Sequence, residues 1–297
     1  MTTVPPQASG LPAGRPPTEG ERWATEALTS LRAAGFAPAA IIRFVQESID
    51  RASDTRARRG GLARQARRWS IAGAGAALAL REALSRLGAG APSRSTLLTW
   101  CAIQAAMLDW HLGMVEGLEG HPRSRLSAAD ALTLGRGALA PFAAAAPPDG
   151  LWFLLLLVAA GGSDRLDGRL AQGVGATRFG RDFDPLADLA FRGAAVHGAA
   201  RAEWLTPAAV RALAARQLLL AAGAAWHWFG RSRRPPQDAA RLARWDAPPL
   251  LTGLALGAAG QPTRGSALVT LAAAVGTAGL TRAHRAATSA ARHMITL

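Results

Sequence analysis

The chain has 297 residues and a formal net charge of +14, and its 34 basic residues are all arginine. Its single cysteine, Cys101, excludes a disulfide or a thiolate cluster within the chain. Mean hydropathy is slightly positive at +0.11. Such strong positive charge on an apolar chain leaves two classes of partner, nucleic acid and the anionic surface of a membrane.

The first residues, 1–21, are rich in proline, glycine and threonine and are predicted to be disordered. They lack the charged start and apolar core of a secretory signal. Apolar residues then recur at helical spacing through 22–52, which predicts two amphipathic helices with a break near 35–38. These helices begin a helical N-terminal extension that we expect to cover 22–125.

A basic run between Arg56 and Arg68 follows, directly before Trp69. We expect this run to face lipid headgroups on the cytosolic side, because an apolar segment comes next. Residues 69–88 and 95–117 then form a predicted helical hairpin. Two alternatives stay open for it: a transmembrane hairpin, which gives eight crossings in all, or an interfacial or cytosolic hairpin beside six core crossings.

The predicted fold is an all-α, polytopic membrane helix bundle with six core transmembrane helices in the domain 126–297. The core helices are expected at 131–147, 150–172, 184–202, 207–229, 246–260 and 266–283. Arginines are dense in alternate loops, which by the positive-inside rule places one end of the bundle in the cytosol. A soluble nucleic-acid binder need not show this alternation, so we expect a multi-pass protein of the cell membrane and no nucleic-acid partner.

Four carboxylates follow the apolar run 151–160 at helical spacing. Asp164 and Asp167 share one helix face, and Asp184 and Asp188 share a face of the next helix. Glycines between them suit a sharp connection. Facing carboxylates repel in a partly dry site, and a divalent cation that prefers oxygen ligands relieves that repulsion. The pattern therefore predicts a metal site, and oxygen ligands of this kind suit Mg²⁺.

The same residues resemble the signature of the CDP-alcohol phosphotransferases, membrane enzymes of phospholipid synthesis. That signature reads Asp-x-x-Asp-Gly-x-x-Ala-Arg, eight residues, Gly-x-x-x-Asp-x-x-x-Asp. The positions matched here are Asp164, Asp167, Gly168, Ala171, Gly180, Asp184 and Asp188. Upstream, Leu132-Thr133-Leu-Gly-Arg136 is similar to the Leu-Thr-x-x-Arg opening of the family's first core helix.

The resemblance implies Mg²⁺, or Mn²⁺ in its place, held by Asp164, Asp167, Asp184 and Asp188. It implies Asp188 as the general base that takes the acceptor's proton. The donor is a CDP-alcohol lipid, CDP-diacylglycerol in the first instance, and CMP leaves. Residues expected to line the nucleotide pocket are Gly168, Ala171, Gln172 and Gly180. A homodimer is expected from the resemblance alone.

Two features depart from the family pattern. Gln172 stands where the family has Arg, and seven residues rather than eight precede Gly180. The charge of that arginine could contact the donor's phosphates, so its absence bears on the affinity for the donor. Arginines that could replace it are Arg169, Arg178 and Arg181.

The acceptor is expected to be a small alcohol or phospho-alcohol. A phosphorylated acceptor would suit the arginines that could face the site, namely Arg136, Arg192, Arg231, Arg233 and Arg234. The alternative function is a catalytically inactive membrane protein of the same fold, which binds CDP-lipid or a protein partner. Asp109 and His111 could form a second metal site, although hydrogen bonds to neighbours are commoner for such residues.

Overall fold

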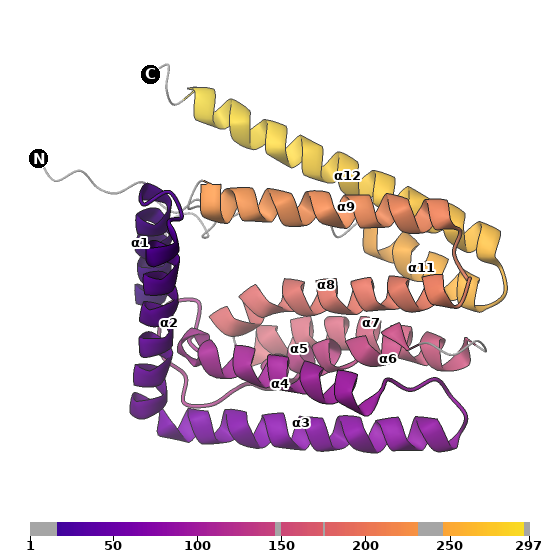
Figure 1. Cartoon of the computed structure of the whole chain (residues 1–297), viewed down its shortest axis with the longest axis horizontal. Helices are drawn as coiled ribbons and strands as arrows, with labels where there is room; N and C mark the ends of the chain where they lie inside the picture. The colour runs from indigo at the N-terminus through magenta and orange to yellow at the C-terminus, as the bar shows by residue number, and fades with distance from the viewer. Residues whose placement is uncertain (1–16, 146–149, 175, 231–245, 294–297) are drawn as a thin grey trace, which may run out of the picture. The chain divides into compact units, whose positions relative to one another are not determined.

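The computed structural model describes residues 17–145, 150–174, 176–230 and 246–293. Within its helices, side chains are described except at 164–165, 167–174, 227–228 and 283–293. The described residues are helical and contain no strand, which confirms the all-α prediction. They divide into two compact units, one of 42–204 with 257–261 and the other of 1–41, 205–256 and 262–297. The helices of each unit are labelled in Figure 1.

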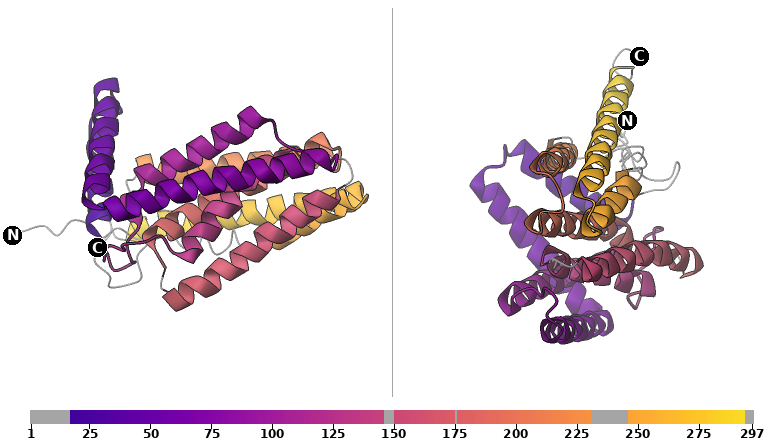
Figure 2. Two further views of the ribbon diagram at one scale, coloured as in Figure 1. Left: turned by 90° about the horizontal axis from the view of Figure 1, so that it is seen from below. Right: turned by 90° about the vertical axis from the view of Figure 1, so that its right-hand side faces the viewer.

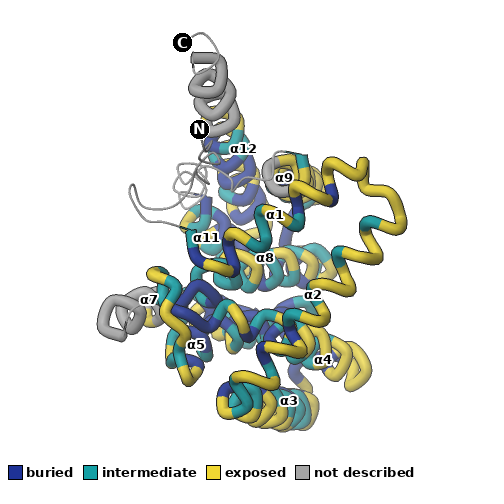
Figure 3. Tube along the Cα trace, turned by 90° about the vertical axis from the view of Figure 1, so that its left-hand side faces the viewer, coloured by how far each residue is buried: buried dark blue, intermediate teal, exposed yellow. Residues whose placement is uncertain are grey.

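The predicted amphipathic pair at the N-terminus is present as α1 (Glu19–Ala33) and α2 (Pro38–Arg58). Its break lies where the sequence placed it, because Gly35 and Phe36 both have positive φ angles, 59° and 57°. Helix α1 begins with a capping box between Thr18 and Glu21, inside the stretch 1–21 that we expected to be disordered. Residues 1–16 of that stretch lie outside the described residues. Much of α2 is exposed (Figure 3).

The predicted hairpin consists of α3 (Gly60–Arg86) and α4 (Arg94–Trp110), which pack side by side (Figure 2). Leu84, Leu97 and Phe142 are buried together, so the hairpin shares a core with the short helix that contains Pro141. Residues 42–125 of the extension therefore belong to one unit with the start of the expected core domain, and 22–41 belong to the other unit. The expected domain boundary between 125 and 126 stays a prediction.

The first core helix, expected as one span over 131–147, is broken into α5 (Ala128–Ala138) and α6 (Ala140–Ala144). The cause is Pro141, which has no N–H to donate to the carbonyl of Gly137 four residues earlier. The indole Nε1–H of Trp100 donates to that carbonyl instead, at 2.9 Å. Gln104 Nε2 donates to the carbonyl of Leu134 at 3.2 Å. Helix α4 thus supports the end of α5 through two backbone carbonyls.

The next two helices are α7 (Leu151–Val174) and α8 (Arg178–Arg201), and both pack against α5. Helix α7 agrees with its predicted span of 150–172. Helix α8 begins six residues earlier than expected, because the hydroxyl of Thr177 accepts a hydrogen bond from the N–H of Gly180 and caps it. The helix continues through Pro185, which cannot bond the carbonyl of Arg181.

The other unit contains α9 (Pro207–Ala225), the π-helical turn η2 (Trp226–Gly230), α12 (Pro262–His293) and most of α11 (Ala247–Ala258). Helices α9 and α12 pack along each other. Helix α11 also approaches α12 closely and needs glycine at 253, where a Cβ would lie 2.7 Å from the carbonyl oxygen of Gly265. The sequence offered no role for Arg216. The structure provides one, since Arg216 forms a buried ion pair with Asp246.

By length and composition, one described helix, α9, is suited to cross a bilayer. Shorter apolar helices cover Leu151–Ser163 and Ala247–Ala258. The prediction of six crossings, or of eight with the α3–α4 hairpin, therefore stays a prediction.

Candidate active site

The acidic pattern falls on two consecutive helices of one unit. Asp164, Asp167, Gly168, Ala171 and Gln172 lie in the second half of α7, and their side chains are outside the described residues. Asp184 and Asp188 lie one turn apart in the first half of α8. The described part of the site therefore consists of the α8 carboxylates and the side chains that meet them.

Both α8 carboxylates converge on one nitrogen of Arg136. Its Nη1 lies 2.6 Å from Oδ1 of Asp184 and 2.6 Å from Oδ1 of Asp188. The Arg136 side chain is 2% exposed, whereas those of Asp184 and Asp188 are 35% and 22% exposed. Arg136 therefore forms the buried base, or floor, of the site, and the two carboxylates are the part of the site that solvent can reach.

Two further side chains complete the described cluster. Arg136 Nε donates to Ser163 Oγ on α7 at 3.2 Å. Arg192 Nη2, one turn beyond Asp188, donates to Asp188 Oδ2 at 3.0 Å. Ser163 directly precedes Asp164 in the chain, so the start of the acidic half of α7 reaches the same arginine. Helices α5, α7 and α8 thus meet at Arg136.

A second group of polar side chains lies at the N-termini of α5 and α8. Asp130 is fully buried and accepts a hydrogen bond from Thr177 Oγ1 at 2.5 Å. A Cβ on Gly180 would lie 3.2 Å from Asp130 Oδ1 and 3.2 Å from Thr177 Oγ1. Gly180, which we expected in the nucleotide pocket, therefore has a packing reason in this structure.

A family model of the CDP-alcohol phosphatidyltransferases matches residues 126–278. The chain belongs to this family. The match begins just before α5 and covers the acidic helices, so it confirms the resemblance found in the signature. No curated protein and no solved structure gives a significant match.

Membership of the CDP-alcohol phosphatidyltransferase family makes the chain a member of a transferase class. The family transfers a phosphatidyl group from a CDP-alcohol in phospholipid synthesis. Its members are typically integral membrane proteins and generally depend on a divalent metal.

The described residues fit that metal requirement. Two carboxylate oxygens on adjacent turns already converge on a single cationic nitrogen. Hard oxygen donors of this kind suit Mg²⁺. Within the part of the chain whose side chains are described, no three His, Cys, Asp or Glu residues form a group. The remaining ligands that the signature implies, Asp164 and Asp167, lie outside that part.

Two of the three arginines considered as substitutes for the missing charge at Gln172 are engaged elsewhere. Arg178 Nη1 pairs with Glu116 at 2.9 Å, and both side chains are nearly buried. Arg181 Nε pairs with its neighbour Asp182 at 2.8 Å. The third, Arg169, is outside the described side chains, as are the acceptor candidates Arg231, Arg233 and Arg234.

The second candidate metal pair is satisfied by its neighbours. Asp109 forms an ion pair with Arg56 Nη1 at 2.5 Å. A ring nitrogen of His111, Nδ1, lies 2.7 Å from the carbonyl oxygen of Met107, and the ring packs on Phe183. Hydrogen bonds to neighbours, the commoner arrangement, therefore account for both residues.

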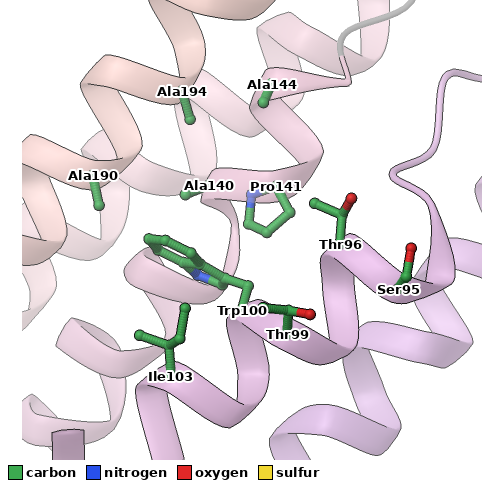
Figure 4. A pocket seen from close by; sticks show the side chains of 10 residues that line it. All are labelled: Ser95, Thr96, Thr99, Trp100, Ile103, Ala140, Pro141, Ala144, Ala190 and Ala194. Carbon is green, nitrogen blue, oxygen red and sulfur yellow. The ribbon is translucent and has the colours of Figure 1, made fainter.

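An open pocket of about 530 Å³ lies elsewhere in the same unit, among α4, α6 and α8 (Figure 4). Trp100 and Pro141 face it, and none of the signature residues lines it. Ala190 and Ala194 reach it from a face of α8 that is turned by about 120° from the face of Asp184 and Asp188, given 100° per residue. The pocket is therefore separate from the carboxylate site.

Sequence reasoning missed Asp130, Ser163 and Thr177. A usable signal was present for Asp130, because Ser127 and Asp130 have the spacing of a capping box, which the structure confirms. Thr177 carries the local signal of a helix N-cap, because its hydroxyl accepts from the N–H of Gly180. Its contact with Asp130 and that of Ser163 with Arg136 carry no such signal, since these partners lie on other helices.

Proposed function

We propose that the chain catalyses Mg²⁺-dependent transfer of a substituted phosphate group from a CDP-alcohol, with CDP-diacylglycerol as donor, to an acceptor hydroxyl. CMP is the second product. The supporting observation is the convergence of Asp184 and Asp188 on the floor formed by Arg136, on helices that carry the family signature.

The reaction exchanges one phosphorus–oxygen bond for another. The acceptor oxygen bonds to the phosphorus that bears the lipid alcohol, and the bond from that phosphorus to the oxygen of CMP breaks. The acceptor's proton goes to Asp188, whose carboxylate is accessible and adjoins Asp184. When bound, Mg²⁺ neutralises the diphosphate and the charge that develops on the departing CMP.

The residues of the chain hold this arrangement in place. Asp184 and Asp188, with Asp164 and Asp167 from α7, supply the metal ligands. Arg136 orients the two α8 carboxylates, and its 2% exposure makes it a positioning residue rather than a contact for the acceptor. Arg192 is 22% exposed beside Asp188 and is the described arginine best placed to receive a phosphorylated acceptor.

The site is proposed to face the cytosol in a multi-pass protein of the cell membrane. Two features support this orientation, the distribution of arginines among the loops and the water-soluble nature of CMP and of the acceptor. The nucleotide is proposed to lie along Gly168, Ala171 and Gln172 on α7, where small residues permit close approach.

The test is a CMP-release assay with the full-length chain in membranes, using CDP-diacylglycerol and a panel of acceptors that includes glycerol phosphate and inositol phosphate. We expect release with at least one acceptor in Mg²⁺ or Mn²⁺, and its loss in EDTA. Intact, membrane-inserted protein that releases no CMP with any acceptor would overturn the proposal. Retained activity in EDTA would overturn its metal dependence.

The alternative is an inactive relative that binds CDP-lipid or a protein partner, and Gln172 is the observation that favours it. Gln172→Arg restores the signature. An inactive parent that gains large activity from this single change supports the alternative, whereas an active parent excludes it.

A further inference from the structure

The buried carboxylate of Asp130 joins the first turns of two helices. Its Oδ2 accepts hydrogen bonds from the N–H of Ser127 at 2.7 Å and from the Ser127 hydroxyl at 2.8 Å, which closes the capping box of α5. Its Oδ1 accepts from Thr177 Oγ1 at 2.5 Å. The same threonine oxygen accepts from the N–H of Gly180 at 2.9 Å and caps α8. One continuous chain of hydrogen bonds therefore fixes both helix starts.

The hydrogen bond between Asp130 and Thr177 affects the carboxylate site through the positions of Arg136 and Asp184 along α5 and α8. Arg136 lies six residues after Asp130, a rise of about 9 Å along α5, and Asp184 lies seven residues after Thr177, about 10.5 Å along α8. The two helices pack against each other, so these similar rises from a shared start bring Arg136 level with Asp184. A slip of one turn, about 5.4 Å, would separate them.

We propose that Asp130 and Thr177 are positioning residues for the transfer reaction: they set the axial register of α5 against α8, and Gly180 is small because a side chain there would press on their hydrogen bond. Asp130 is fully buried and lies outside the signature, and Thr177 is also buried. The inference rests on the proposed metal site for its consequence, but the link itself can be measured independently of metal.

The main test compares Thr177→Val, which keeps shape and loses the hydroxyl, with Thr177→Ser, which keeps the hydroxyl. Hydrogen exchange of peptides covering 177–184 is followed in the full-length protein in EDTA. We expect at least tenfold faster exchange in Thr177→Val and less than threefold change in Thr177→Ser. Unchanged protection in Thr177→Val, or equal damage in both variants, would overturn the link.

The consequence is measured as the affinity for Mn²⁺ alone, from the rise in melting temperature with metal concentration, and as kcat and KM for CMP release. Thr177→Val is expected to raise the Kd for Mn²⁺ at least tenfold and to lower kcat more than it changes the KM for the donor. Unaltered Mn²⁺ affinity in a variant whose α8 exchanges faster would overturn the positioning role. If the parent protein binds no Mn²⁺, the proposed function fails, while the exchange experiment still decides the link.

A second pair of variants covers the case in which Thr177→Val does not fold. Gly180→Ala adds one methyl group, which intrinsic helix propensity alone would favour. We expect it instead to raise the Kd for Mn²⁺ about tenfold, because the new Cβ crowds Asp130 and Thr177. In an Asp130→Ala background, Gly180→Ala should raise the Kd for Mn²⁺ less than twofold. An equal effect of Gly180→Ala in both backgrounds would overturn the proposal.

Discussion

Two buried arginines, one in each compact unit, are neutralised in different ways. Arg136 has one nitrogen shared between two carboxylates that are partly exposed, at 35% and 22%. Arg216 pairs with Asp246, and both side chains are only 3% exposed. Gly276 packs so closely on the second pair that a Cβ there would lie 2.6 Å from Arg216 Nε.

The difference distinguishes a cluster that a ligand can reach from a pair that only stabilises the fold. The Arg216–Asp246 pair is closed on both sides, so its charges can only satisfy each other and the surrounding helices. The carboxylates at Arg136 are partly exposed, so a ligand can reach them without unfolding the helices. The accessible carboxylates beside Arg136, and not the closed pair, are therefore the site that we propose.

The largest expected effect is on catalysis. Asp188→Asn keeps the shape of the side chain and removes its charge, and should lower CMP release about 10³-fold with little change in melting temperature. Asp182→Asn is the matched control on the same helix, because Asp182 pairs with Arg181 and takes no part in the proposed chemistry. Activity within threefold of the parent in Asp188→Asn would refute its role as base.

Substitutions in the closed pair of Arg216 and Asp246 should change the stability of the protein rather than its activity. Arg216→Met leaves Asp246 buried without its cation and should cost about 3–5 kcal/mol of stability. The double variant Arg216→Met with Asp246→Leu should recover most of that loss, because apolar side chains then fill the space. Thermal unfolding in detergent measures both variants, and specific activity of the folded fraction should stay near that of the parent. A single variant as stable as the double would contradict this account.

Removing the arginine from the open cluster should cost less stability, and the stability of the variant should depend on metal. Arg136→Gln leaves two carboxylates facing each other, but both can be rehydrated, so we expect a loss below about 3 kcal/mol in EDTA. Because a divalent cation would supply the missing positive charge, excess Mg²⁺ should raise the melting temperature of this variant more than that of the parent. Identical Mg²⁺ responses in the two proteins would show that Arg136 and metal do not share the carboxylates.

The smallest effect is expected at Gly276. An alanine there would bring a Cβ to 2.6 Å from Arg216 Nε and 2.7 Å from Asp246 Oδ2, and overpacking should cost about 1–3 kcal/mol. Gly223 is the control, since a Cβ there meets nothing within 4 Å and α9 should gain from alanine. Unfolding temperatures of the two variants should move in opposite directions, and a stabilised Gly276→Ala would count against the close packing.

Local signals account for what could be predicted. The break at Gly35, the α3–α4 hairpin and the span of α7 follow from apolar periodicity and turn residues, which act within a few positions of the chain. The split at Pro141 was also readable in principle, because proline lacks the N–H that a continuous helix needs. The early start of α8 was not predicted, since its cap Thr177 lies among glycines that indicated a longer connection.

The sequence by itself determined the family of the protein, because Asp164, Asp167, Gly168, Gly180, Asp184 and Asp188 match the family signature within one short stretch of chain and the family model covers them. Tertiary structure alone decided what surrounds them. It brought Arg136 into contact with Asp184 and Asp188, and it linked Asp130 to Thr177 across two helices. Those contacts join residues 47 to 52 positions apart, and helical periodicity carries no information about which faces of two distant helices meet.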